Sequence, residues 1–262
     1  MKIYTKKSLI KALRKIKKLG WIKTQRPGND GGVGNTLEDL LGIPENNLAI
    51  ANTVDWELKT QRKNTTSLVT LFHTDPQPRK PFTIVAKHLL PVYGWKHKEA
   101  GKKYPESELS FRATLTGSRS TDRGFSVKVN SIKSRVELVF DFKRVDARHK
   151  KWITKVKKNL NSSKTALVAY WTFEELQKKC AGKIRNTIFV VAETRKNNGH
   201  EEFNYSGIWK LEDFVFNNFL KGIIKGKLFV DFDARTGHNH GTKFRVFARD
   251  WPIFFSKVTK IS

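Results

Sequence analysis

The sequence predicts a mixed α+β fold rich in antiparallel strands. Short segments in which apolar and polar residues alternate recur through the chain, as at Leu109, Phe111, Ala113 and Leu115. This period of two is typical of strands with one buried face. Amphipathic stretches with helix start and stop residues lie among them. Apolar residues make up 38% of the 262 residues, which is enough for a sizeable core.

The helices are expected from apolar spacing and capping residues. Ser8 is placed to cap the first helix, and Gly20 to stop it. Its apolar stripe is Leu9, Leu13, Ile16 and Leu19. Residues 27–35 read as a glycine-rich loop without the spacing of a nucleotide-binding motif. Further helices are expected over 36–41 with Gly42 as the stop, 149–160, 173 to about 181, and 211–220.

The strands are expected where apolar residues alternate or form short β-branched runs. Pro91 and Gly94 argue against one continuous helix over 81–100, which stays unassigned. Gly117 to Gly124 reads as a turn between two strands. The expected strands cover residues 52–60, 67–73, 109–115, 125–129, 136–142, 166–171, 187–194, 227–233 and 242–247.

The charge balance predicts a polyanionic partner. Lysine and arginine number 51 against 24 acids, a net charge of +27. Residues 8–19 would suit an anionic membrane surface, but basic residues recur along the whole chain, which favours nucleic acid. No apolar run is long enough to span a membrane and no secretory signal begins the chain. The single cysteine, Cys180, excludes an internal disulfide and fits a cytoplasmic protein.

Asp55, Glu57 and Lys59 alternate within the expected strand at 52–60. In a strand, side chains two apart share one face, so two carboxylates and an ammonium would converge. Carboxylates are ligands that Mg²⁺ prefers, and a lysine beside them can orient a water at a phosphate. This pattern indicates metal-dependent cleavage of a nucleic-acid backbone. Exposed strands also alternate Asp, Glu and Lys as a solvated surface, which is the alternative.

Two segments carry a resemblance to a known family. Residues 34–47, Gly-Asn-Thr-Leu-Glu-Asp-Leu-Leu-Gly-Ile-Pro-Glu-Asn-Asn, followed by Glu-Leu-Lys-Thr at 57–60, resemble the catalytic half of MvaI/BcnI-type restriction endonucleases. These are relatives of the mismatch-repair nicking enzyme MutH. Residues 230–245, with Val-Asp-Phe-Asp-Ala-Arg-Thr and Asn-His-Gly-Thr-Lys-Phe-Arg, resemble the recognition segment of that family.

The resemblance implies a restriction-endonuclease-like (MutH-like) fold of the PD-(D/E)xK class, with a mixed sheet flanked by helices. It implies one nuclease domain of two lobes, roughly residues 1–100 mainly catalytic and roughly 101–262 mainly for DNA recognition. It also implies Mg²⁺ dependence and a monomer that cuts a short, nearly palindromic double-stranded DNA site. A CC-N-GG type of site and a cognate DNA methyltransferase, in a bacterial or archaeal cytoplasm, belong to the same implication.

The resemblance assigns roles in the catalytic half. Glu57 would be a metal ligand, Lys59 the water-orienting cation, and Glu38 a helical glutamate acting on the water or behind the ligands. The slot for the second acidic ligand falls near Asn52, which is neutral. Either Asp55, which has the right parity, serves instead, or the slot is Asn52 and the chain is a weakened nuclease, since an amide binds Mg²⁺ less well than a carboxylate.

The DNA-contact candidates lie mainly on the late strands. Arginine can grip guanine and aspartate can accept from cytosine, so the Asp/Arg alternation suits a site rich in G·C pairs. The alternative is an internal salt-bridge ladder. His73, at the end of a strand, is either a base-edge contact or a structural histidine, and His238 and His240 suit a loop that reads DNA. The candidates are Arg62, His73, Arg119, Arg123, Asp231, Asp233, Arg235, His238, His240, Lys243 and Arg245.

Three functions are compatible with these features. The first is a type II restriction endonuclease. The second is a MutH-like strand-nicking repair endonuclease, which would leave open circles rather than fixed linear fragments. The third is a non-catalytic DNA-binding protein, whose binding would depend steeply on salt and which no divalent metal would turn into a nuclease.

Overall fold

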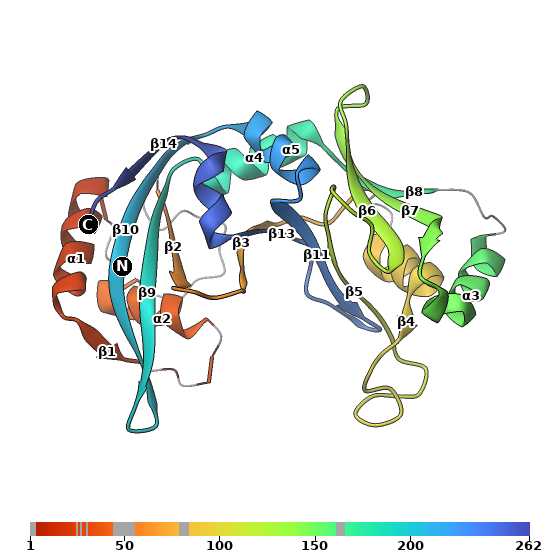
Figure 1. The fold of residues 1–262 in the computed structure, drawn as a ribbon, viewed down its shortest axis with the longest axis horizontal. Coiled ribbons are helices and arrows are strands. Elements are labelled where there is room, and N and C mark those ends of the chain that lie inside the picture. The colour runs from red at the N-terminus through yellow and green to blue at the C-terminus, as the bar shows by residue number, and fades with distance from the viewer. Residues whose placement is uncertain are drawn as a thin grey trace. The chain divides into compact units, whose positions relative to one another are not determined.

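The computed structural model describes residues 4–24, 26, 28–29, 31–43, 56–78, 84–160 and 166–262. Helices and mostly antiparallel strands alternate along the chain, so the expected mixed α+β class is confirmed (Figure 1). The chain forms two compact units, each built from separate segments. Unit 1 contains residues 1–69, 178–216 and 248–262, and unit 2 contains 70–177 and 217–247. No helix in the described ranges is both long and apolar enough to cross a membrane.

Unit 1 is built on one sheet in which a single pair of strands is parallel. Its order is β1-β10-β9-β2, and β14 pairs with β10. β2 runs parallel to β9, with Glu57 opposite Thr187. The strands are β1 (Trp21–Lys23), β2 (Glu57–Arg62), β9 (Thr187–Asn197), β10 (His200–Phe214) and β14 (Phe255–Lys260).

The hairpin of β9 and β10 corrects one expectation. The helix expected over 211–220 begins later than expected: β10 continues to Phe214, and helix α5 (Phe216–Ile224) follows, so only residues 216–220 of that segment are helical. Asp213 has a φ of 57°, which marks the change of direction. Asn198 and Gly199 both have positive φ and join the two strands. An Asn-Gly pair is the preferred sequence for a tight hairpin turn, because both positions of that turn need positive φ.

Helix α1 (Lys6–Lys18) begins earlier than expected. Thr5 is the N-cap, and Ser8 is the third residue of the helix. The side chain of each accepts a hydrogen bond from the backbone N–H of the other, which forms a capping box. Leu9, Leu13 and Ile16 are buried, as their spacing predicts. Leu19 is 62% exposed and does not belong to that stripe.

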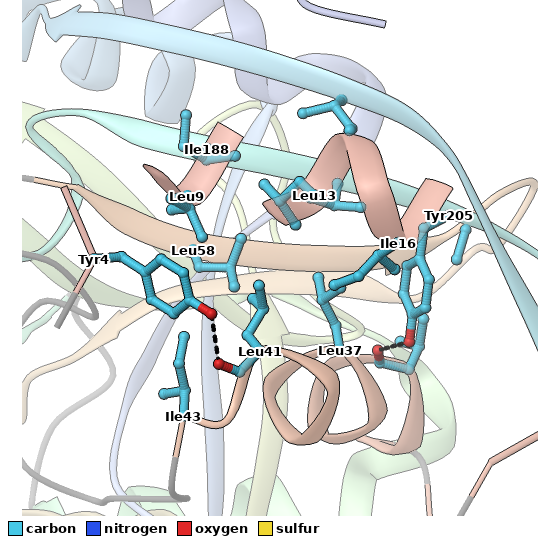
Figure 2. Close-up of a cluster of buried hydrophobic side chains, with 14 of the residues drawn as sticks. Tyr4, Leu9, Leu13, Ile16, Leu37, Leu41, Ile43, Leu58, Ile188 and Tyr205 are labelled. Carbon is cyan, nitrogen blue, oxygen red and sulfur yellow. Dashed lines mark hydrogen bonds between the residues drawn. The ribbon is translucent and has the colours of Figure 1, made fainter. Parts of the chain in front are cut away.

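Helix α2 (Gly32–Leu41) begins inside the segment that was expected to be a loop. Its end is as expected: Gly42 has a φ of 66°, a conformation that glycine adopts without steric cost. α1, α2 and one face of the sheet share a single apolar core, in which Leu13, Leu37 and Leu58 come from three different elements (Figure 2).

Unit 2 contains two further sheets. The first has the order β3-β13-β11-β5-β4, with β12 paired to β11, and the second has the order β6-β7-β8. Their strands are β3 (Leu68–His73), β4 (Trp95–Lys96), β5 (Leu109–Leu115), β6 (Arg123–Asn130), β7 (Arg135–Val145), β8 (Ala166–Thr172), β11 (Leu228–Arg235), β12 (His238–Asn239) and β13 (Lys243–Phe247). The strands expected from alternation in these regions are confirmed.

The remaining helices are short. Residues Val85–Tyr93 form a π-helix, η1, that contains Pro91 and ends at Gly94, so 81–100 is indeed no continuous helix. The expected helices near 149–160 and 173–181 are confirmed. Helix α3 covers Lys150–Leu160 after a 3₁₀ turn, Ala147–His149, and helix α4 covers Phe173–Ile184, while a 3₁₀ segment covers Ala248–Phe254.

Leu13 on α1 and Leu19, which caps its C-terminus, provide a test of the unit 1 core. Leu13 is 1% exposed and Leu19 is 62% exposed. Replacing a buried leucine with alanine removes packing and leaves a cavity, so Leu13→Ala should lower the free energy of unfolding by about 2–5 kcal/mol. Leu19→Ala should change it by less than about 0.5 kcal/mol. Denaturant unfolding measures both, and equal effects would contradict the assigned helix face.

Candidate active site and nucleic-acid interface

Glu57 and Lys59 lie together at the start of β2. The Glu57 N–H donates to the carbonyl of Asn186 at 3.0 Å, which fixes the strand beside β9. Leu58 points into the core, so its two neighbours share the opposite face. The Lys59 Nζ lies 2.8 Å from Glu57 Oε1. The structure therefore brings together two members of the predicted carboxylate–ammonium face.

The second oxygen of Glu57 is the most informative atom of the site. Glu57 is 8% exposed, and its Oε2 is buried without a hydrogen-bond partner in the described part of the chain. A buried acceptor left in this state costs about 1–3 kcal/mol, and more when it is charged. A hard divalent cation, which takes oxygen ligands, would remove that cost. Glu57 therefore fits the role of a metal ligand.

A pocket of about 600 Å³ opens beside Glu57 within unit 1. Its lining mixes cations and carboxylates: Lys6, Trp56, Glu57, Ala181, Gly182, Lys183, Arg185, Asn186, Glu212 and Asp213. Lys6, Lys183 and Arg185 give it positive charge next to the buried carboxylate. Such a pocket suits an anionic group, because the cations attract it while Glu57 remains available to a metal.

Glu212 is a pocket carboxylate that the sequence did not indicate. It forms ion pairs with Lys210 at 2.7 Å and with Lys6 at 3.7 Å. Burial tends to raise its pKa, but the hydrogen bond and charge of Lys210, with Lys6 and Lys257, bring the pKa below its usual value. Glu212 is therefore ionised at neutral pH. It was missed because residues 211–220 were expected to be a helix, whereas the strand that follows the Asn198-Gly199 turn continues to Phe214.

Asn52 and Asp55 lie outside the described residues, as does the loop that would carry them into the site. The choice between them as the second acidic position therefore stays a prediction. Within the described ranges, no three His, Cys, Asp or Glu side chains gather as a metal-binding group. Glu57, with its buried and unpartnered Oε2, is a described residue that could hold a cation.

Glu38 lies on α2, whose two ends are fixed by buried tyrosines (Figure 2). The Tyr205 hydroxyl donates to the carbonyl of Val33 at 2.9 Å, and the Tyr4 hydroxyl donates to the carbonyl of Leu41 at 2.6 Å. Burial raises the pKa of Tyr205 above its usual value, so its hydroxyl remains a donor. The two bonds tie α2 to the sheet and to the segment before α1, and they fix the orientation of the helix that carries Glu38.

The candidates on β11 and β13 form one polar face in unit 2. Asp231 accepts from Arg245 at 2.9 Å and from Thr114 at 2.8 Å. Asp233 pairs with Arg112 at 2.8 Å and more loosely with Lys243 at 3.8 Å. Their side chains alternate with the buried Phe232 and Ala234. The structure brings this set together and shows the salt-bridge ladder that was weighed as the alternative.

Arg235 ends this face beside a separate pocket. It donates to Glu108 at 3.0 Å, and its guanidinium stacks on the Tyr104 ring with a centroid distance of 4.5 Å. The pocket has a volume of about 360 Å³ and is lined by His97, Lys98, Glu99, Lys103, Tyr104, Arg112, Asp233, Arg235 and His240. A planar cation held between a carboxylate and an aromatic ring is oriented before any ligand arrives.

The histidine candidates lie around one loop of unit 2. His238 and His240 are exposed, and their rings meet edge to face at 4.2 Å. His73 is exposed at the end of β3. Gly241 lies beside its ring, because a Cβ added at position 241 would be 3.6 Å from His73 Cδ2. Asp75 holds the loop by accepting from the backbone and hydroxyl of Thr242 at 2.8 and 2.9 Å. Asp75 is thus a supporting residue that the sequence did not indicate.

The other three cations have different surroundings. Arg62 forms a two-bond ion pair with Glu201, at 3.1 and 3.3 Å. Arg119 is exposed in its turn. Arg123, which was expected on the same turn, begins β6, and its guanidinium stacks on the rings of Trp95 and Trp152 at 4.5 and 5.2 Å. Burial lowers the pKa of Arg123, and the two ring contacts favour a structural role over entry into a groove.

The comparison with known proteins agrees with this geometry. The sequence profile of the MvaI/BcnI restriction endonuclease family matches residues 10–255. The chain belongs to the MvaI/BcnI restriction endonuclease family. It is therefore a member of a nuclease family, and the expected resemblance is confirmed over nearly its whole length. Among curated proteins, none matches the chain significantly.

Two solved structures share the fold of this MvaI/BcnI family member. One is the restriction endonuclease MvaI in complex with its cognate DNA substrate, with a TM-score of 0.77. It is 24% identical, and the match covers 97% of each chain. The other is MvaI in the absence of DNA, with a TM-score of 0.52 and 24% identity over 97% of this chain and 98% of that one. These likenesses confirm the restriction-endonuclease-like fold.

The tyrosine anchors of α2 can be tested in this MvaI/BcnI family member. Tyr205→Phe keeps the ring but leaves the carbonyl of Val33 without its buried donor, so the free energy of unfolding should fall by about 1–3 kcal/mol. Tyr104→Phe is the control, because no described group hydrogen-bonds to its hydroxyl and its ring contact with Arg235 survives. Denaturant unfolding compares them. Equal stabilities would contradict the role given to the Tyr205 hydroxyl.

Proposed function

We propose that the protein is a type II restriction endonuclease that hydrolyses phosphodiester bonds at a short, nearly palindromic site in double-stranded DNA. The observation that carries this proposal is the buried Glu57 carboxylate, with Lys59 on one oxygen and no described partner on the other. Membership in the MvaI/BcnI family supports it independently. A solvated surface, the alternative weighed for this strand, would leave Glu57 exposed.

In this proposal, Glu57 would hold a divalent cation, with Asp55 or the residue at position 52 as a second oxygen ligand. Mg²⁺ is proposed because carboxylates are hard ligands that suit it. Bound there, the cation would stabilise negative charge on the phosphate and lower the pKa of a coordinated water.

The protein groups perform the remaining tasks. The Lys59 ammonium, held by Glu57, orients the attacking water and stabilises charge on the phosphate. Lys6, Lys183 and Arg185 line the same pocket and attract the DNA backbone. Water attacks phosphorus in line, the bond to the leaving sugar oxygen breaks, and that oxygen is protonated from solvent. Glu38 acts on the water or behind the ligands.

The recognition role belongs to the polar face of unit 2. Arg235 and the Asp231–Arg245 pair suit guanine and cytosine edges, so a CC-N-GG type of site is proposed. The ion pairs of this face support the proposal because they already hold these side chains in one conformation. The entropy cost of ordering them when DNA binds is therefore smaller. His73, His238 and His240 would contact DNA from the same unit, and Arg119 and Lys243 would contribute positive charge there. Arg62 would contribute a DNA contact from unit 1. A monomer in the cytoplasm with a cognate methyltransferase completes the proposal.

Plasmid cleavage tests the catalytic assignment. With Mg²⁺, the protein should produce linear fragments of fixed length, and Lys59→Ala should slow cleavage by about 10²–10³-fold, the usual effect of removing one group that stabilises developing charge. Lys196→Ala is the control, because Lys196 is an exposed lysine on the neighbouring strand β9. Equal rates for Lys59→Ala and the unchanged protein would refute the role of Lys59.

The same assay separates the alternatives. Open circles that persist would indicate a MutH-like nicking enzyme. Absence of cleavage with every divalent metal would leave two cases, and Asn52→Asp distinguishes them. Cleavage restored by Asn52→Asp would show a nuclease weakened at its second acidic ligand. Binding without restored cleavage would show a non-catalytic DNA-binding protein.

A further inference from the structure

A second cationic feature of unit 1 shares no residue with the pocket beside Glu57. A groove of about 730 Å³ is lined by residues of α1, of β10 and of the last strand, β14. Seven of its lining residues are lysine or arginine and none is acidic. Its lining is Lys7, Ile10, Lys11, Arg14, Lys15, Lys18, Lys210, Thr259, Lys260 and Ile261.

Most of these cations are not neutralised by the protein. The five on α1 are exposed, and none of them forms an ion pair within the described residues. The polar face of unit 2 is different, because Arg112 and Arg245 each pair there with an aspartate at 2.8–2.9 Å. Uncompensated like charges along one groove repel one another, and an external polyanion would relieve that repulsion.

The spacing along α1 places the cations in one row. Lys7, Lys11, Arg14, Lys15 and Lys18 recur at three- and four-residue intervals, so they share one helix face. At about 1.5 Å per residue the row spans about 16 Å, the axial length of about five base pairs. The opposite face, with Leu9 and Leu13, is buried in the core. α1 therefore has no free apolar face to insert into a membrane, which favours nucleic acid as the polyanion.

We propose that this groove is a second DNA-binding surface, which holds the phosphate backbone of duplex DNA without regard to sequence. Its ligand is the row of backbone phosphates, contacted by the α1 cations and by Lys260, whereas Lys210 is held by Glu212 at 2.7 Å. Such contacts supply the salt-dependent, non-specific affinity that retains a protein on DNA between encounters with its site. The groove acts through charge alone and requires neither Glu57 nor a metal.

Non-specific binding measured as a function of salt tests this proposal. The probe is a duplex of alternating A and T, in EDTA so that no cleavage occurs. Lys11→Gln with Arg14→Gln removes two groove cations and should lower the slope of log affinity against log salt by about two. The matched control is Lys155→Gln with Lys158→Gln on α3, which removes two exposed cations from another helix and should leave the slope unchanged. Lys11→Arg with Arg14→Lys keeps both charges and should also keep the slope.

The outcomes are distinct. Equal slopes of log affinity against log salt for the groove and control variants would overturn the proposal. A groove variant that keeps its slope on the duplex but loses binding to vesicles of anionic lipid would also overturn it. Unchanged thermal unfolding of the groove variant shows that a lower slope reflects lost contacts. Because the measurement is made without divalent metal, failure of the catalytic assignment leaves its result unaffected.

Discussion

The buried carboxylate at the start of β2 is the constraint around which unit 1 is arranged. An ionised glutamate is costly to bury unless its oxygens are paired. Lys59 satisfies one Glu57 oxygen at 2.8 Å, and the other has no described partner. The backbone of Glu57 is fixed by Asn186, and Leu58 anchors the strand in the core. The unpartnered oxygen of Glu57 lowers the stability of the fold, and binding a cation would remove that cost.

The scaffold that supports this carboxylate is largely apolar. α1 and α2 pack on one face of the sheet, and tyrosine hydroxyls bond to the first and last turns of α2 (Figure 2). These bonds orient α2 because a buried hydroxyl has few alternative acceptors. Precise placement of reactive groups depends on such supporting contacts, since a small displacement of a catalytic group can cost much of the rate.

Charge is distributed unevenly over the molecule. On the β11 face, Asp233 and Asp231 pair with Arg112 and Arg245 from the neighbouring strands β5 and β13. On the outer face of α1, five cations have no acidic partner among the described residues. The first arrangement suits a surface that must present side chains in fixed positions, as base reading requires. The second suits a surface that needs only positive potential.

Much of the fold followed from local patterns, and the failures have physical causes. The alternating residues of β5, the leucine spacing of α1 and the stop at Gly42 were sufficient because each depends on neighbours in sequence. Residues 211–214 were mistaken for the start of a helix because apolar spacing alone does not separate a buried strand from a helix. The Asn198-Gly199 turn indicates only that a second hairpin strand begins at His200.

Within the site, the sequence was sufficient to predict that Glu57 and Lys59 share one face of a strand, because side chains two residues apart point the same way. Glu212 was not predicted, because its segment was expected to be helical, and Asp75 was not, because its partner Thr242 lies far along the chain. The stacking of Arg123 on Trp95 and Trp152 was unreadable for the same reason. The ion pairs of β11 were predicted only as an alternative to DNA contacts. The sequence shows which charged residues alternate along a strand, but not which residues of the neighbouring strands pair with them.

The most direct test of the Glu57–Lys59 assignment is the location of a metal ion. Crystals of the protein with duplex DNA and Mn²⁺, examined by anomalous scattering, would place it. We expect an anomalous peak at bonding distance from Glu57 Oε2, about 2.0–2.6 Å for hard cations. A clear metal peak elsewhere, with Glu57 Oε2 bonded only to protein groups or solvent, would contradict the central claim.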